Sequence, residues 1–169
     1  MSVEHFTSRD MLDTTLCLPL TEVSILLGMK KRGFGAGRWN GIGGKPKEGE
    51  SIEAAAVREL EEEIGLKISM GDLKKYAVLD FFFEHKPDWN QRVHIFFVKR
   101  WVGEPTESEE MRPQWFKFSE IPFDAMWPDD RLWLPEVLQG KLIAGKFYFS
   151  DDGKTIARYE IREDNLRFF

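Results

Sequence analysis

The clearest hydrophobic pattern in the chain predicts a helix that ends at Gly65. Its apolar face is formed by residues that recur at helical spacing: Ala56, Val57, Leu60 and Ile64. Glycine adopts the left-handed conformation that closes many helices, so Gly65 is a natural stop. Glu59, Glu62 and Glu63 share a second, acidic face, because residues three and four apart are neighbours on a helix.

Apolar and β-branched runs bounded by turn residues predict five strands in the body of the chain. They are Thr14–Leu18, Val23–Met29, Tyr76–Glu84, Arg92–Val102 and Trp115–Phe118. The short turn Pro19–Glu22 joins the first two strands, and we expect those two to pair. His85–Gln91 connects the third and fourth, which we also expect to pair. A glycine-rich loop, residues 30–45, precedes the acidic helix.

The C-terminal part of the chain predicts one more helix and a hairpin. The helix covers Asp129–Gln139, with Gly140 as its stop and Pro135 in its first turns, where a missing N–H costs least. The hairpin turns at Asp152-Gly153. Strands and helices in this mixed order favour an α+β or α/β sandwich over a doubly wound parallel sheet. With 169 residues, the chain is predicted to form a single domain, residues 1–169.

Composition narrows the classes of function. Apolar residues make up 42% of the chain, which supports a folded globule. The net charge of −5 argues against binding to a nucleic-acid polymer, but a nucleotide-sized anion is compatible with it. Cys17 is the single cysteine, which fits a reducing compartment, and its place in a strand favours a buried thiol. No run approaches the ~20 apolar residues that span a bilayer.

These features predict a monomer in the cytoplasm that does not associate with membranes, with nuclear or mitochondrial pools also open. Residues 1–12 have no apolar secretory core and are expected to form a poorly ordered N-terminal extension.

The acidic helix face has two interpretations. A solvated surface is the ordinary one for an isolated glutamate triplet. Glu59, Glu62 and Glu63, however, repel one another on a helix that is fixed against a core, and a hard cation such as Mg²⁺ or Mn²⁺ removes that conflict. Gly43-Gly44 just upstream allows the backbone to approach an ion or a phosphate closely. We favour a metal site.

This stretch resembles the signature of the Nudix hydrolases at every position. The matching residues are Gly44, Glu50, Arg58, Glu59, Leu60, Glu62, Glu63, Gly65 and Leu66. The resemblance implies an α/β/α sandwich with a mixed central sheet, and a metal-dependent enzyme that cleaves a diphosphate linked to another moiety.

The same resemblance implies roles for individual residues. Glu59 and Glu63 are metal ligands, the Gly43 carbonyl is a further ligand, and Glu62 is a nearby ligand or water-orienting group. Gly44, Glu50 and Arg58 support the site, with Arg58 fixing the glutamates through ion pairs. A distant acid usually completes such sites, and we choose Glu110 from the run Glu107, Glu109 and Glu110. The general base is either Glu63 or Glu110.

Two segments, residues 28–45 and 110–130, resemble the animal Nudix enzymes that hydrolyse oxidised purine nucleoside triphosphates, such as 8-oxo-dGTP and 2-hydroxy-dATP, to the monophosphate and pyrophosphate. The resemblance assigns base recognition to Asn40, Trp127, Asp129 and Asp130, with Thr15, Lys30 and Met111 lining the site. Phe34, Phe81 and Phe83 are expected to close the pocket.

Elementary chemistry agrees with this assignment. Trp127 offers a stacking face, and the Asn40 amide both donates and accepts hydrogen bonds. Two adjacent carboxyls in an apolar pocket tend not to ionise together, so Asp129 and Asp130 would offer one donor and one acceptor. Each residue also has a purely structural interpretation: Asp129 as a helix N-cap, Trp127 as core, and Lys30 as part of a solvated turn.

The chain departs from those enzymes in places. Gln91 stands where they have an apolar pocket residue, the region 76–92 is longer, and Pro19 interrupts the first strand pair. These departures affect the expected base preference and leave the metal site untouched. Two alternatives stay open: a Nudix pyrophosphohydrolase of other substrates, such as unmodified or methylated purine nucleotides or dinucleoside polyphosphates, and a catalytically silent nucleotide-binding module.

Overall fold

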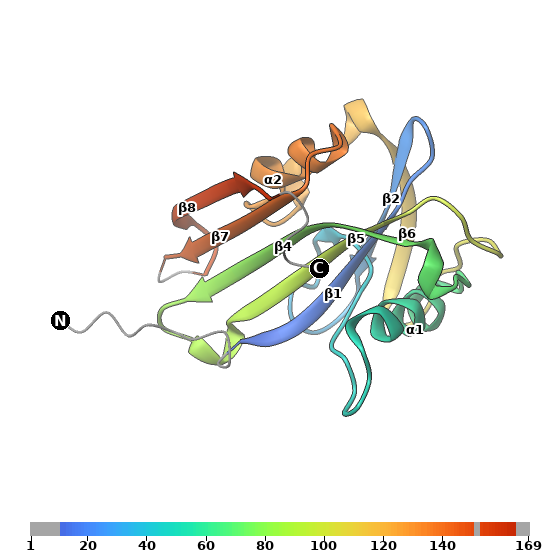
Figure 1. Cartoon of the computed structure of the whole chain (residues 1–169), viewed down its shortest axis with the longest axis horizontal. Helices are drawn as coiled ribbons and strands as arrows, with labels where there is room; N and C mark the ends of the chain where they lie inside the picture. The colour runs from blue at the N-terminus through green and yellow to red at the C-terminus, as the bar shows by residue number, and fades with distance from the viewer. Residues whose placement is uncertain (1–10, 151–152, 165–169) are drawn as a thin grey trace.

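Helices α1 (Ile52–Ile64) and α2 (Asp130–Leu138) cover opposite faces of a central layer of strands (Figure 1). The structure is a computed structural model and describes residues 11–150 and 153–164. Residues 1–10 of the expected extension therefore lie outside the described residues, whereas Leu12 already begins the first strand. No helix in these described ranges is long and apolar enough to cross a membrane.

The strands form two sheets. A mixed five-stranded sheet has the order β1-β5-β4-β7-β8, and an antiparallel three-stranded sheet has the order β3-β2-β6. In chain order the elements are β1 (Leu12–Pro19), β2 (Ser24–Lys30), β3 (Trp39–Asn40), α1 (Ile52–Ile64), β4 (Leu73–Phe83), β5 (Gln91–Val98), β6 (Met111–Lys117), α2 (Asp130–Leu138), β7 (Ile143–Phe149) and β8 (Ile156–Glu163).

Strand periodicity explains the sandwich. Along β5, Val93, Ile95 and Phe97 pack into a core with α2, whereas Phe96 and Val98 pack into a second core with α1. Successive side chains of a strand point to opposite faces, so one apolar strand supplies both cores. The predicted α/β/α sandwich with a mixed sheet is confirmed.

The expected pairing of the first two strands is wrong. β1 runs parallel to β5, and β2 pairs with β3 and β6 in the other sheet. The other edge of β1 is already used: the Cys17 N–H donates to the Ile42 carbonyl at 2.6 Å and the Thr15 N–H to the Gly44 carbonyl at 2.9 Å. This pairing brings the glycine-rich loop against β1, which positions Gly43 and Gly44.

Other boundaries differ by a few residues. β4 begins three residues earlier than expected, and β6 begins at Met111 because its whole length pairs with β2. β5 ends at Val98, since Val102 bridges instead to Lys67. The antiparallel pairs β4–β5 and β7–β8 are confirmed, whereas the hairpin turn predicted at Asp152-Gly153 falls partly outside the described residues. Pro135 is the sixth residue of α2, in its second turn.

Candidate active site

Helix α1 holds the acidic residues in a fixed orientation. The Ser51 hydroxyl caps its start by accepting from the Ala54 N–H at 3.1 Å, and Gly65 closes it with a φ of 76°. Ala56, Leu60 and Ile64 are buried against the sheet. The opposite, acidic face therefore has little freedom to rotate, and it lies beside the Gly43-Gly44 loop.

Arg58 binds three glutamates at once. Its Nε and Nη2 donate to the two Glu50 oxygens at 2.8 Å each, and its Nη1 donates to Glu59 at 2.8 Å and to Glu62 at 3.0 Å. The hydrogen bonds from Arg58 lower the pKa of Glu50 to about 2. The structure thus contains the ion pairs predicted for Arg58, and they hold the three carboxylates together around one guanidinium.

Glu63 has a different environment from its neighbours on the helix. Burial, followed by the negative charge of Glu59, raises the pKa of Glu63 to about 8. Its Oε2 is buried and has no hydrogen-bond partner among the described residues.

Cys17 lies buried near Glu63. Burial, together with the charge of Glu63, raises the pKa of the Cys17 thiol to about 12, so this buried cysteine is a structural residue as predicted.

The two loop glycines are required by close packing. A Cβ at Gly43 would overlap the backbone carbonyl of Thr15, and a Cβ at Gly44 would lie 2.6 Å from Glu59 Oε1. The Gly44 carbonyl also accepts from the Thr15 hydroxyl at 3.2 Å. A larger residue at Gly43 would push the loop off β1, and one at Gly44 would displace the Glu59 carboxylate.

Glu110 and Glu62 are the most exposed of the predicted acidic residues. The Glu110 side chain is 47% exposed and paired with Arg32, whose Nε donates at 2.9 Å, and the Glu62 side chain is 54% exposed. Neither residue lines the central cavity, but the charge of Glu110 does contribute to the raised pKa of Glu63. Glu110 therefore interacts with the helix electrostatically across the loop.

The donor set fits a divalent cation. Glu63 carries an unpartnered buried oxygen, and hard cations prefer carboxylate and carbonyl oxygen. Within the described ranges, no three acidic, histidine or cysteine side chains already surround one point. Arg58 binds one oxygen of Glu59 and one of Glu62, and Arg32 binds one oxygen of Glu110, so the second oxygen of each carboxylate lies outside these pairs and can ligate a cation.

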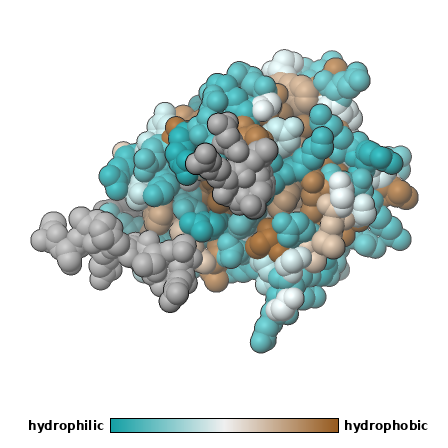
Figure 2. Space-filling model, viewed as in Figure 1, coloured by the Kyte–Doolittle hydropathy of each residue, from teal (hydrophilic) through white to brown (hydrophobic). Residues whose placement is uncertain are grey.

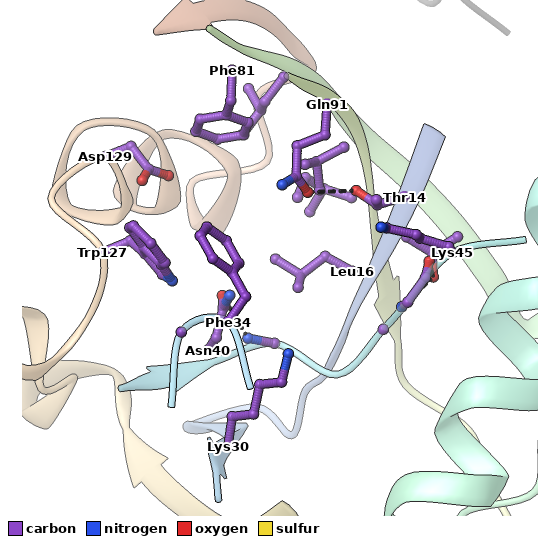
Figure 3. A pocket seen from close by; sticks show the side chains of 18 of the residues that line it. Thr14, Leu16, Lys30, Phe34, Asn40, Lys45, Phe81, Gln91, Trp127 and Asp129 are labelled. Atoms are coloured by element: carbon purple, nitrogen blue, oxygen red, sulfur yellow. Dashed lines mark hydrogen bonds between the residues drawn. The ribbon is translucent and has the colours of Figure 1, made fainter. Parts of the chain in front are cut away.

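All ten residues predicted to bind substrate line one cavity of about 410 Å³ (Figure 3). Gly43, Gly44 and Glu63 line the same cavity. The ten residues are Thr15, Lys30, Phe34, Asn40, Phe81, Phe83, Met111, Trp127, Asp129 and Asp130. The acidic helix and the predicted base-binding residues therefore meet in one space, although they come from segments far apart in the sequence.

The Asp129–Asp130 pair is buried at the far end of this cavity. Burial raises the pKa of Asp129 to about 6, and burial with the charge of Asp129 raises the pKa of Asp130 well above its usual range. Asp129 stands at the N-cap position but makes no capping bond; it accepts from Trp133 Nε1 at 2.8 Å. Asp130 Oδ2 has no partner among the described residues. Helix capping therefore does not explain these two carboxyls.

Trp127 is partly exposed to the cavity. The Phe34 ring lies 5.2 Å away, and the Arg38 guanidinium lies 4.2 Å from its ring centre. Nearby, Asn40 Oδ1 accepts from the Gly41 N–H at 2.9 Å, which leaves the Asn40 amide donors available. Trp127 and Phe34 thus place aromatic rings in the cavity near a polar amide, which is a combination suited to a planar base.

The sequence left several cavity residues unassigned. Leu16, Lys45, Trp89 and Trp133 line the cavity together with the predicted set. Trp133 follows Asp129 by four residues, and this helical spacing could have indicated their hydrogen bond. No sequence signal pointed to Trp89, which reaches the cavity from the connection between β4 and β5.

Comparison with known proteins agrees with this geometry. The NUDIX domain matches residues 12–137. The chain belongs to the Nudix family. Nudix hydrolases generally use divalent metal ions, in keeping with the donor set around Glu63.

The oxidized purine nucleoside triphosphate hydrolase of Mus musculus is 54% identical over 149 residues, covering 88% of this chain and 93% of that protein. The protein of the same name from Danio rerio is 52% identical over 135 residues, which cover 80% of this chain and 85% of that protein. The crystal structure of a MutT protein from Bacillus halodurans has a TM-score of 0.77 at 26% identity, and covers 89% of this chain and 97% of that one. The Nudix fold thus extends over most of the chain.

Proposed function

We propose that this Nudix enzyme hydrolyses oxidised purine nucleoside triphosphates, of the 8-oxo-dGTP and 2-hydroxy-dATP type, to the monophosphate and pyrophosphate with Mg²⁺, which removes damaged precursors from the nucleotide pool. One observation carries the proposal: the cavity that holds the buried, unpartnered Glu63 oxygen at one end holds a buried aspartate pair at the other. The names of the mouse and zebrafish relatives support the same substrate class.

The acidic end is suited to phosphate chemistry. Glu59, Glu63, Glu62 and the Gly43 carbonyl would hold Mg²⁺, or Mn²⁺ in its place, and the cation would neutralise phosphate charge and activate a water. Arg58 orients the glutamates, and Glu110 is the additional acid expected near them. Glu63 and Glu110 are the candidates for the group that accepts the proton of the attacking water.

The far end of the cavity is suited to an oxidised purine. Trp127 provides a stacking face, and Asn40 presents amide donors to the base edge. At neutral pH the aspartate pair retains a proton, so one carboxyl donates while the other accepts. An oxidised purine carries a keto group and an added N–H at altered positions, and this mixed edge matches a donor and an acceptor side by side.

A direct test measures pyrophosphate release at saturating Mg²⁺ from 8-oxo-dGTP, 2-hydroxy-dATP and dGTP. We expect kcat/KM to be at least about tenfold higher for an oxidised purine than for dGTP, which corresponds to roughly 1.4 kcal/mol of discrimination. Comparable rates on all three substrates would discard the oxidised base while keeping the Nudix chemistry. Negligible turnover of all three would also discard this substrate class, and a wider panel of nucleoside diphosphate derivatives would then separate a Nudix enzyme of other substrates from a silent binding module.

We also propose that the protein is a monomer in a reducing compartment such as the cytoplasm. The single cysteine, which is buried, is in line with such a compartment. Hydrophilic residues cover most of the face seen in Figure 2, where hydrophobic residues appear in small, separate areas. Light scattering on the purified protein checks the monomer, for which we expect a mass close to 19.8 kDa.

A further inference from the structure

The floor of the cavity contains one polar spot. Side chains from one face of β1, β5 and β4 form this floor, and most of them are apolar, including Leu16, Val93 and Phe81. Thr14 on β1 and Gln91 on β5 are the exceptions among the floor residues that these strands present by alternation. Thr14 and Gln91 therefore place hydrogen-bonding groups on a floor whose other side chains offer only apolar contact.

Hydrogen bonds fix the Gln91 amide. The Thr14 hydroxyl donates to Gln91 Oε1 at 3.3 Å, and Gln91 Nε2 donates to the Trp89 carbonyl at 3.3 Å. The amide nitrogen carries two hydrogens, so one donor is left for the cavity, and the Thr14 oxygen keeps lone pairs that can accept. The pair thus offers one donor and one acceptor, already oriented.

The sheet order places this pair between the two ends of the site. Gly44 hydrogen-bonds to Thr15 of β1, so the metal-binding end lies at the β1 side. Trp127 contacts Phe149 of β7 at 6.3 Å between ring centres, so the base-binding end lies at the β7 side. β5 lies between β1 and β4, and Figure 3 shows Gln91 between Lys45 on one side and Trp127 and Asp129 on the other.

In a nucleoside triphosphate the sugar joins the phosphates to the base. We propose that Gln91 and Thr14 bind the sugar and determine specificity there, with Gln91 Nε2 donating to the 3′-hydroxyl and the Thr14 oxygen accepting from it. This inference rests on the proposed function, because it uses the assignment of the two ends. It makes Gln91 a substrate-contacting residue that selects nucleotides with an intact 3′-hydroxyl.

The test compares 2′-deoxy with 2′,3′-dideoxy substrates that carry the same base. In the unsubstituted protein we expect kcat/KM for 8-oxo-dGTP to exceed that for its dideoxy form by roughly five- to tenfold, the effect of losing the hydrogen bonds of the 3′-hydroxyl. In Gln91→Met, which keeps the side-chain volume, we expect this ratio to fall most of the way to one, because only the Thr14 acceptor remains. Thr14→Val should reduce the ratio in part. Gln114→Met is the matched control, because Gln114 is exposed on β6 away from the cavity, and should keep the full ratio.

A structural role for Gln91 would lower kcat/KM for both sugars equally and leave their ratio unchanged in Gln91→Met, which would overturn the proposal. A ratio near one in the unsubstituted protein would overturn it as well. Repeating the comparison with dGTP and ddGTP, and with calorimetric Kd values for dGMP and ddGMP, removes any dependence on the oxidised base and on turnover. Loss of base preference with an intact sugar ratio would therefore count against the proposed function alone.

Discussion

The two ends of the cavity use carboxylates in opposite ways. At the helix end, Arg58 binds Glu50, Glu59 and Glu62, and its hydrogen bonds lower the pKa of Glu50 to about 2. At the far end, burial raises the pKa values of Asp129 and Asp130, so that the pair retains a proton. The same chemical group is thus prepared for a cation at one end and for a hydrogen-bonding base edge at the other.

Glu63 shows what separates the two ends. It belongs to the acidic helix by sequence, yet Arg58 does not bind it, and burial raises its pKa to about 8. A carboxyl in that state is protonated at neutral pH, and it releases its proton once positive charge arrives nearby. The pKa of a glutamate at the helix end is therefore decided by its arginine partners and its burial, and its position in the acidic run does not decide it.

The largest effect is expected from Glu63→Gln, which removes the buried charge and keeps the shape. We expect kcat to fall by on the order of 10²–10⁴-fold, the range for losing a general base or an electrostatic contact to the reacting group. Glu61→Gln is the matched control, because Glu61 is half-exposed on the same helix. Near-normal turnover in Glu63→Gln would remove Glu63 from the reaction.

The next effect concerns the aspartate pair. Replacing both Asp129 and Asp130 by Asn should lower kcat/KM for 8-oxo-dGTP by roughly ten- to a hundredfold, because a buried polar mismatch costs 1–3 kcal/mol, roughly, per hydrogen bond. Turnover of dGTP should change less. Steady-state kinetics on both substrates checks this, and an equal loss on both would mean that the pair does not read the base.

A smaller effect is expected from Arg58→Lys. Lysine keeps the charge but cannot hold Glu50 with two parallel bonds while also binding Glu59, so we expect kcat to fall roughly tenfold with little change in KM. Arg131→Lys provides the control, since the Arg131–Asp124 pair is well exposed to solvent. If Arg58→Lys behaves like Arg131→Lys, the ion-pair network has no role in turnover.

The smallest effect is expected on the way the free energy of unfolding changes with pH. Folded Asp129 and Asp130 hold protons at pH values where unfolded aspartates, with a pKa near 3.8, have lost them. The folded state then binds more protons, so the free energy of unfolding falls as pH rises from about 4 through the folded pKa values. Asp130→Asn should make this decline shallower between pH 5 and pH 8, because the variant has no carboxyl at this position to hold the extra proton. Urea unfolding measures it, and an unchanged slope in the variant would contradict the raised pKa of Asp130.

The helix end could be predicted from sequence because it depends on local spacing. Glu59, Glu62, Glu63 and Gly65 are related by helical geometry alone, and Gly43-Gly44 lie in the loop that leads into this helix. The sandwich was also predictable, since alternation along β5 requires a layer on each face.

The rest depends on contacts between distant segments. Pairing of β1 with β5 rather than β2 arises because residues 42–44 occupy the other edge of β1, which no local pattern indicates. The Arg32–Glu110 pair and the Trp89 contact join residues from separate loops. Asp129 could be interpreted from sequence as an N-cap, and only the Trp133 hydrogen bond in the folded protein shows that its side chain is used otherwise.

The central claim is that one end of the cavity selects the base while the other carries out the chemistry. Calorimetry on Glu63→Gln, comparing the Kd values of 8-oxo-dGMP and dGMP, tests this claim most directly. We predict that the ratio of the two Kd values matches that of the unsubstituted protein although turnover is lost. A ratio that collapses to one would show that the two ends do not act separately and would contradict the account.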